Sequence, residues 1–202
     1  MATKNIIFDL GGVILNIDVR KTQKAFTSLG VKNIEEVFRM GHVESFFKSY
    51  EVGAIDDSQF INSIQKAAGI QVAAEIVVEA WNALLLDFPP ERINFIKELK
   101  SKYRLFLLSN TSALHHVRFH EIFNEEFGGS LDDLFDKAYY SHIIKLHKPN
   151  TAAYQLIVDE NGLTPGETLF IDDSAANVEG AEKAGLKALH LSNGKTILDL
   201  GL

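Results

Sequence analysis

Five short apolar runs, most of them separated by segments with a helical pattern, constrain the fold of this chain more than any other feature. The runs are Asn5–Asp9, Arg104–Ser109, Lys137–Ser141, Thr168–Asp172 and Ala188–Leu191. In the first run Ile6, Ile7 and Phe8 follow one another with no polar residue between them, which is typical of a strand buried on both faces. Helical patterns occupy Glu91–Tyr103, Ala113–Phe123, Ala152–Asn161 and Ala175–Ala184. This alternation predicts an α/β fold with a mostly parallel sheet.

Residues 16–87 do not continue the alternation. They contain no comparable strand-like run, and the apolar residues from Ile76 to Leu85 recur with the period of an amphipathic helix. We therefore predict two domains. Residues 1–15 and 88–202 form the α/β core, and residues 16–87 form a compact helical insert between the first and second strands.

The composition excludes several classes of protein. With no cysteine among its 202 residues, the chain has neither disulfides nor zinc–thiolate sites. A net charge of −7 argues against a nucleic-acid partner and against an anionic membrane surface. No segment reaches the roughly 18 apolar residues that span a bilayer, and the first strand begins too early for a signal peptide. We expect a cytoplasmic protein with neither a nucleic-acid nor a membrane partner, and the sequence leaves its oligomeric state open.

Polar residues stand at the ends of the strand-like runs or just before a predicted helix. They are Asp9, Ser109, Asn110, Lys148, Asp172 and Asp173. The carboxyl ends of parallel strands meet at one edge of a sheet, where α/β proteins bind ligands. Because a buried carboxylate is costly unless it is paired, we interpret Asp9 as a functional residue and not as a turn residue.

The chemistry of these residues indicates phosphoryl transfer. Asp9 and Asp173 together form an all-oxygen site suited to Mg²⁺, and a carboxylate can also attack phosphorus to form an acyl-phosphate. A transferring phosphoryl group needs positive charge and hydrogen-bond donors around it. Lys148, Ser109 and Asn110 offer these groups and are predicted to bind the substrate phosphate.

Four motifs, in this order, resemble those of the haloacid dehalogenase superfamily. They are Phe8-Asp9-Leu10-Gly11-Gly12-Val13, Leu107-Leu108-Ser109-Asn110, Lys148-Pro149 and Phe170-Ile171-Asp172-Asp173-Ser174-Ala175-Ala176-Asn177. The resemblance covers the chain from Asn5 to about Leu191. It implies a Rossmann-like core with an inserted α-helical cap, as in the C1-capped subgroup.

The resemblance also implies roles for individual residues. Asp9 would be the nucleophile, and Lys148 would stabilise the charge of the phosphoryl group. Mg²⁺ would be held by Asp9, Asp173 and the backbone carbonyl of Gly11. Asp172 would act on this site through a water molecule or through Lys148.

Within the superfamily, the first and last motifs are most similar to those of bacterial sugar-phosphate phosphatases. The group that acts on α-D-glucose 1-phosphate is the most similar in particular. Two stretches of the predicted cap, Arg39–His42 and Glu51–Ile55, are similar to that group too. The resemblance therefore implies a small phosphorylated metabolite as the substrate.

One position departs from the usual phosphatase pattern. Typical phosphatases of the superfamily have a second aspartate two residues after the nucleophile, which serves as the general acid and base, and this chain has Gly11 there. General acid–base catalysis typically contributes roughly 10²–10⁴-fold in rate. Asp18 and His42 are candidate substitutes, although Asp18 also fits the N-cap of a helix.

Two other features have simpler interpretations. Asp173 or Ser174 could cap the helix that follows the last motif. His116 and His120 have the spacing of a metal pair on one helical face, but without an evident third ligand we interpret them as part of a solvated face.

The sequence therefore predicts a Mg²⁺-dependent phosphatase, a phosphoric monoester hydrolase that forms an aspartyl-phosphate on Asp9. Two alternatives remain. The first is a metal-independent 2-haloacid dehalogenase, against which the pair Asp172-Asp173 argues. The second is a binding or regulatory protein that keeps the fold but has lost turnover, which Gly11 favours.

Overall fold

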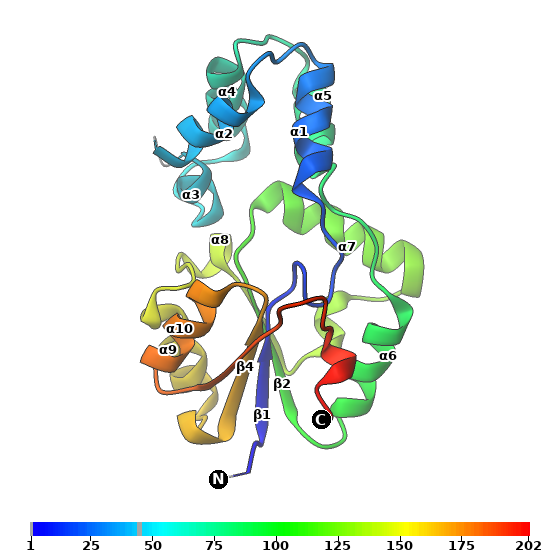
Figure 1. Cartoon of the computed structure of the whole chain (residues 1–202), viewed down its shortest axis with the longest axis vertical. Helices are drawn as coiled ribbons and strands as arrows, with labels where there is room; N and C mark the ends of the chain where they lie inside the picture. The colour runs from blue at the N-terminus through cyan, green and yellow to red at the C-terminus, as the bar shows by residue number, and fades with distance from the viewer. Residues whose placement is uncertain (1, 44–45) are drawn as a thin grey trace.

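Among the residues that the structure describes, a five-stranded parallel sheet, with the strand order β3-β2-β1-β4-β5, lies between helices in the lower half of the molecule (Figure 1). This computed structural model describes residues 2–43 and 46–202, and describes residues 40, 42 and 43 by their backbone alone. The strands are β1 Asn5–Phe8, β2 Arg104–Ser109, β3 Lys137–Tyr140, β4 Thr168–Asp172 and β5 Lys187–His190. The predicted α/β fold and its parallel sheet are confirmed.

The register of the sheet brings the ends of the inner strands to one level. Phe8 of β1 lies beside Leu107 of β2 and beside Ile171 of β4. The chain runs outward from β1 through β2 to β3, and then returns to place β4 on the other side of β1. Ligands of open α/β sheets bind at such a switch point, beyond the carboxyl ends of the strands.

Helices cover both faces of the sheet and bury its alternating side chains. They are α6 Pro90–Leu99, α7 Ala113–Phe127, α9 Thr151–Asn161 and α10 Ala175–Lys183. Ile6 and Phe8 of β1 point into the apolar cluster that contains α6 and α7 residues, while Ile7 points into the cluster that contains α9 and α10 residues. Short helices complete the core: α8 Ser141–Ile144 and the 3-10 helices Leu131–Leu134, Pro165–Glu167 and Ile197–Asp199.

In the part of the chain that the structure describes, five helices lie between β1 and the core helix α6, beyond the carboxyl ends of the strands (Figure 1). They are α1 Val19–Ser28, α2 Ile34–Val43, α3 Phe46–Glu51, α4 Asp57–Ala68 and α5 Ala74–Asn82. They share an apolar cluster in which the rings of Phe60 and Trp81 lie 4.7 Å apart. We propose that residues 16–87 form a separate cap domain, because this cluster is distinct from the two clusters on the sheet.

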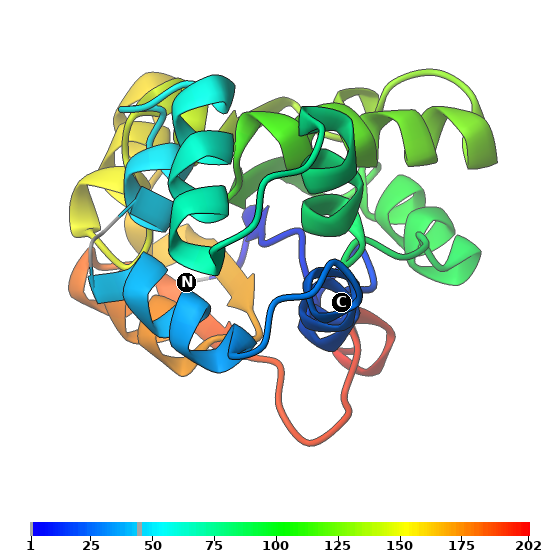
Figure 2. The same ribbon diagram turned by 90° about the horizontal axis from the view of Figure 1, so that it is seen from above.

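Two adjacent backbone segments connect the cap helices to the core. Asn16 donates its N–H to the carbonyl of Asp87 at 3.0 Å, and Leu86 donates to the carbonyl of Asn16 at 3.0 Å. Ile17 and Leu85 form an antiparallel bridge beside them. The segment that enters the cap helices and the segment that leaves them are thus hydrogen-bonded to each other. This pairing fixes the direction in which the cap leaves the core. Viewed from above, the cap helices overlie the core (Figure 2).

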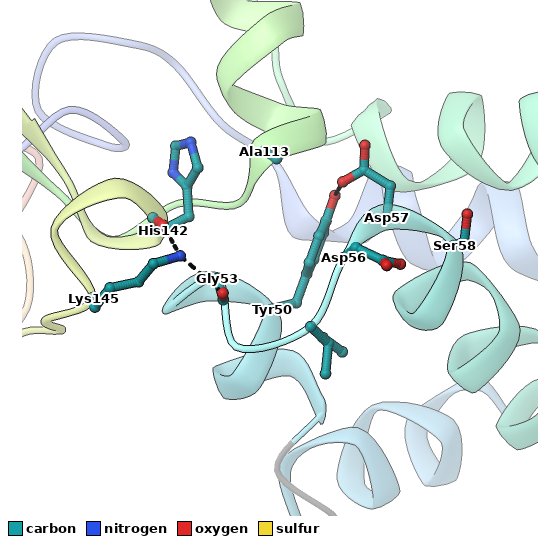
Figure 3. Close-up of a pocket in the computed structure, with 9 residues that line it drawn as sticks. Tyr50, Gly53, Asp56, Asp57, Ser58, Ala113, His142 and Lys145 are labelled. Atoms are coloured by element: carbon teal, nitrogen blue, oxygen red, sulfur yellow. Dashed lines mark hydrogen bonds between the residues drawn. The ribbon is translucent and has the colours of Figure 1, made fainter.

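The cap contacts the core directly at α7 and α8. The Leu114 N–H donates to the Tyr50 hydroxyl at 3.1 Å, and the Lys145 ammonium donates to the Gly53 carbonyl at 2.8 Å. Trp81 stacks on His115 with ring centroids 4.9 Å apart. A cavity of about 360 Å³ lies along this contact, between the cap loop after α3 and helix α8 (Figure 3). Among the described residues, no helix is both long and apolar enough to cross a membrane.

Candidate active site

Three carboxylates converge where β1 and β4 end. Asp9 directly follows β1, Asp172 is the last residue of β4, and Asp173 follows it. One oxygen of each lies within 4.8 Å of the others. Asp9 and Asp172 are buried, whereas Asp173 is exposed. The structure therefore brings together the three aspartates that the sequence singled out.

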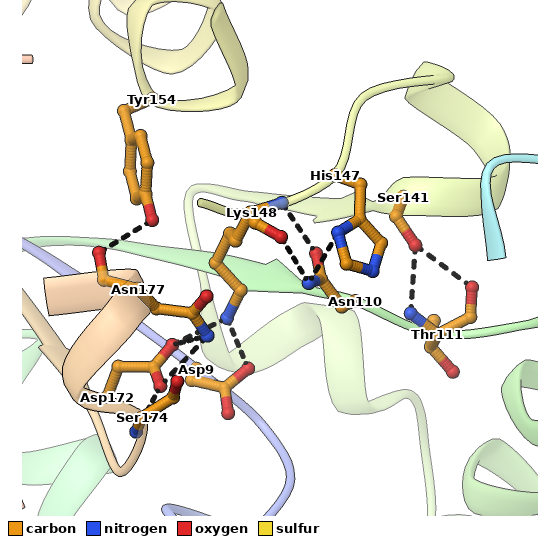
Figure 4. A network of polar contacts seen from close by, with 10 residues as sticks. All are labelled: Asp9, Asn110, Thr111, Ser141, His147, Lys148, Tyr154, Asp172, Ser174 and Asn177. Atoms are coloured by element: carbon orange, nitrogen blue, oxygen red, sulfur yellow. Dashed lines mark hydrogen bonds and ion pairs between the residues drawn. The ribbon is translucent and has the colours of Figure 1, made fainter. Parts of the chain in front are cut away.

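The side chain of Lys148 enters this cluster from the loop before α9 (Figure 4). Its ammonium nitrogen lies 2.6 Å from Asp9 Oδ1 and 2.7 Å from Asp172 Oδ2. The residue is only 1% exposed, and its ammonium nitrogen lies 5.3 Å from the centre of the Phe170 ring. A lysine is rarely buried to this degree unless it is paired, so the two carboxylates account for its position.

Burial and charge shift the pKa values of these groups. Burial raises the pKa of Asp9 to about 7; Lys148 opposes this shift, whereas the charge of Asp172 adds to it. Burial also raises the pKa of Asp173, and the charge of Asp172 adds to that shift. Burial by itself would lower the pKa of Lys148, but the charges of Asp9 and Asp172 outweigh it and raise the pKa.

One ammonium does not balance three clustered carboxylates, two of which are buried. A divalent cation bound by oxygen ligands would supply the missing positive charge. The donor set of Asp9 and Asp173 therefore fits Mg²⁺ on chemical grounds.

Asp172 is bound on both of its oxygens. Oδ1 accepts hydrogen bonds from the Ser174 N–H at 2.8 Å and from the Asn177 amide at 3.1 Å. Oδ2 accepts from Asn177 at 3.0 Å and from Lys148. Asp172 thereby holds both the start of α10 and the lysine, and its action on the site through Lys148 or through a water molecule stays a prediction.

Asp173 does not cap helix α10. The N-cap residue is Ser174, and the N–H bond at this end goes to Asp172 instead. The glycine loop after β1 approaches Asp173 closely, because a Cβ atom on Gly12 would lie 2.4 Å from Asp173 Oδ2. Gly12 also has a φ of 78°, which favours glycine. Both facts explain why a glycine stands at this position.

The side chain of Asn110 has contacts that the sequence did not predict. Its Oδ1 accepts from the Lys148 N–H at 2.9 Å, and its Nδ2 donates to the Lys148 carbonyl at 3.0 Å. The amide thus holds the backbone of the lysine, and its contact with phosphate stays a prediction. Ser109 is buried at the end of β2, opposite Tyr140 in the register.

The two candidate substitutes for the missing acid do not join the cluster in any contact that the structure describes. Asp18 caps α1 by accepting from the Arg20 N–H, and its carboxylate also binds the Arg20 guanidinium at 2.8 Å. That hydrogen bond lowers the pKa of Asp18, which makes it a poor acid at neutral pH. The side chain of His42 lies outside the described residues.

The histidines of α7 do not form a solvated face, so that interpretation is wrong. His116 is half-buried, and its ring lies 4.5 Å from Tyr140 and 4.6 Å from His120. Burial lowers the pKa of His116 to about 4, and the neighbouring His120 and His142 add to the shift. Packing against β3, which periodicity within one helix does not reveal, accounts for the difference.

Sequence reasoning missed two residues next to the cluster, Glu51 and His147. Glu51 Oε2 of the cap lies 2.8 Å from His147 Nε2 of the core. His147 immediately precedes Lys148, which is a signal that could have drawn attention to it. No local pattern links Glu51 to it, because 96 positions separate the two residues.

Known proteins resemble the chain over nearly its whole length. The sequence model of the haloacid dehalogenase-like hydrolases matches residues 3–185. A D-ribitol-5-phosphate phosphatase of Bacteroides thetaiotaomicron is 28% identical over 95% of this chain and 93% of its own.

Solved structures show the same relationship. A haloacid dehalogenase family enzyme of Bacteroides thetaiotaomicron, in complex with magnesium and inorganic phosphate, has a TM-score of 0.91 and 30% identity, and the match covers 100% of both chains. An L-2-haloacid dehalogenase of Xanthobacter autotrophicus, 20% identical with a TM-score of 0.63, covers 94% of this chain and 77% of its own, and shares the fold.

Proposed function

Because the chain belongs to the haloacid dehalogenase-like hydrolase family, we propose that it is a Mg²⁺-dependent phosphatase that forms an aspartyl-phosphate on Asp9. The observation that carries the proposal is the buried contact of Lys148 with Asp9, beside Asp173. A nucleophilic carboxylate, a cation that neutralises phosphoryl charge and a second carboxylate for the metal are thus in one place.

Each residue of the site has its own role in the proposed reaction. Asp9 attacks phosphorus in line, so that a bond forms between its carboxylate oxygen and phosphorus while the bond to the leaving oxygen breaks. Water then attacks the same phosphorus, which releases inorganic phosphate and regenerates the Asp9 carboxylate. Lys148 offsets negative charge at Asp9 throughout. Mg²⁺, held by Asp9, Asp173 and the Gly11 carbonyl, would supply further positive charge at the phosphoryl oxygens.

We expect the substrate to be a small phosphorylated metabolite, with a sugar phosphate as the first candidate. Support for this class comes from the named activity of the Bacteroides relative and from the helical cap over the site. A panel of sugar and polyol phosphates, assayed with Mg²⁺ and with EDTA, tests the proposal. We expect phosphate release that requires Mg²⁺, and its absence across the panel would contradict the proposal.

A dehalogenase is less consistent with the site. Such an enzyme attacks carbon and needs no metal, so it has no use for Asp173 beside Asp9 and Asp172. The same assay distinguishes the two reactions, because release of halide from a 2-haloacid in the presence of EDTA would favour the dehalogenase.

Gly11→Asp is expected to increase turnover of alkyl phosphates by at least about tenfold, since general acid catalysis typically contributes more than this. Among the described residues, a Cβ atom on Gly11 would meet only the side chain of Ile17, whose Cδ1 at 3.3 Å would have to shift slightly. The gain should be small for aryl phosphates, whose leaving groups need no proton. Gly11→Asn is the matched control, and an equal gain in that variant would rule out proton donation as the cause.

Gly12→Ala is expected to raise the Mg²⁺ concentration for half-maximal activity by about tenfold or more. The new methyl group would displace Asp173, from which it would lie 2.4 Å away, and the positive φ adds strain of about 1–2 kcal/mol. A Mg²⁺ titration of activity measures the effect. Gly194→Ala, with a φ of 75° but nothing within 4 Å, controls for strain alone. An unchanged Mg²⁺ requirement would argue against Asp173 as a ligand.

A further inference from the structure

We propose that Glu51 of the cap and His147 of the core are positioning residues for Lys148, so that contact of the cap with the core is transmitted to the catalytic lysine. The path runs from Glu51 through His147 and Asn110 to Lys148. This inference rests on the proposed phosphatase function, and it assigns to the cap an effect on the reacting groups in addition to covering the substrate.

The path consists of consecutive short contacts, of which Figure 4 shows those from His147 through Asn110 to Lys148. Glu51, the last residue of α3, places Oε2 at 2.8 Å from His147 Nε2. His147 Nδ1 lies 3.2 Å from Asn110 Nδ2. The Asn110 amide in turn holds both the N–H and the carbonyl of Lys148, at 2.9 and 3.0 Å. Every step from the cap to the lysine is thus a polar contact.

The hydrogen-bond directions along the path are consistent with one another. Asn110 Oδ1 accepts from the Lys148 N–H, so Nδ2 of the same amide is the donor group. Nδ2 therefore donates to His147 Nδ1, which must be unprotonated to accept. The proton of a neutral His147 then resides on Nε2, and this N–H donates to Glu51. Glu51 selects the ring tautomer that Asn110 requires, as a partner of one imidazole nitrogen generally does for the other.

Contacts outside this path also restrict the position of Lys148. Its side chain is buried between Asp9 and Asp172. The next residue, Pro149, packs against α10 so closely that a Cβ atom on Gly180 would lie 2.4 Å from the Pro149 carbonyl oxygen. Asn110 fixes the backbone at Lys148 itself, through both its N–H and its carbonyl. A displacement of about 1 Å in a catalytic group can lower a rate by about a hundredfold, so the orientation of this amide affects turnover.

Lys145 provides a matched comparison. It also joins cap and core, by donating to the Gly53 carbonyl at 2.8 Å, and it lies near His147 in the sequence. Its second hydrogen bond goes to the His142 carbonyl, so neither bond leads to Lys148. Loss of Lys145 removes a cap–core contact without altering the path.

The test compares Glu51→Ala, His147→Ala and the double variant with Lys145→Met, using a substrate that the wild type hydrolyses. We expect kcat to fall about tenfold or more in both single variants, with a smaller change in KM. The double variant should match the single ones, because both break one path. Glu51→Gln keeps an acceptor oxygen and should restore most of kcat. Lys145→Met should keep kcat within about twofold of the wild type.

Two outcomes would overturn the proposal. One is an equal loss of kcat in Glu51→Ala and Lys145→Met, which would show that Glu51 only holds the cap against the core. The other is a double variant whose loss equals the product of the single losses. An active wild type with either outcome leaves the phosphatase function intact, whereas an inactive wild type overturns that function and this proposal with it.

Nitrogen NMR of the His147 ring tests the path without any turnover. In the wild type we expect a neutral ring protonated on Nε2, and in Glu51→Ala a mixture of the two tautomers. A ring protonated on Nδ1 in the wild type would contradict the assigned directions.

Discussion

Asp9→Asn is expected to lower kcat by at least about 10³-fold, because loss of a nucleophile removes the covalent route and typically costs more than this. The variant keeps the size of the side chain, and its amide can still accept a hydrogen bond from Lys148. The measurement is phosphate release under saturating substrate and Mg²⁺, with circular dichroism to verify the fold.

Asp159→Asn serves as the control, since Asp159 is an exposed residue of α9 whose side chain accepts from Gln155. It should match the wild type. If Asp9→Asn retained wild-type turnover, Asp9 would not be the nucleophile, and the binding-protein alternative would regain support.

Lys148→Met is expected both to abolish turnover and to destabilise the fold by about 3–5 kcal/mol, because it leaves buried carboxylates without their partner. Asp172 is fully buried and Asp9 is 8% exposed, so water cannot replace the ammonium efficiently. Urea denaturation in the presence of EDTA measures the loss of stability. Added Mg²⁺ should recover part of it, since it binds the folded state and offsets the same charges.

Lys137→Met is the comparison for this second prediction. Lys137 pairs with Glu160 on the surface, where both side chains are more than 40% exposed, and exposed pairs contribute little to stability. The denaturation midpoint of this variant should be close to that of the wild type. Equal midpoints for Lys148→Met and the wild type would show that the buried contact is not what stabilises the strand ends.

The strands and the core helices could be predicted because their signals are local. Runs such as Arg104–Ser109 match the observed strand, and Ala175–Ala184 differs from α10 by one residue. The ends of helices were less accurate. Helix α6 stops at Leu99 and not at Tyr103, because Lys100 to Tyr103 form a turn that leads into β2.

The charged residues of the site could also be predicted, because each stands at a fixed place relative to a strand or motif. Asp9, Asp172 and Asp173 converge as the parallel order requires. The two hydrogen bonds of Asn110 to the Lys148 backbone could not be predicted, since they depend on the path of the loop between β3 and α9. The contact between Glu51 and His147 depends on how the cap docks, which no local pattern encodes.

The chain departs from typical phosphatases of the superfamily at position 11, where it has a glycine in place of the acid–base aspartate. The contact between Glu51 and His147 does not replace the missing acid, because each of these two side chains has the other as its partner, 2.8 Å away. Asp18 is paired with Arg20, and the side chain of His42 lies outside the described residues, so the source of the proton for the leaving group stays a prediction to be tested. Gly11→Asp tests how much turnover is limited by this proton.

The most direct test of the central claim is to trap the phosphorylated protein. Acid quenching during turnover with Mg²⁺, followed by mass spectrometry of the digested protein, should show one added phosphoryl group on the peptide that contains Asp9. Borohydride reduction before digestion should convert that aspartyl-phosphate to homoserine at position 9. A modification on another residue, or turnover with no trapped phosphoryl group at Asp9 under any quench time, would contradict the account.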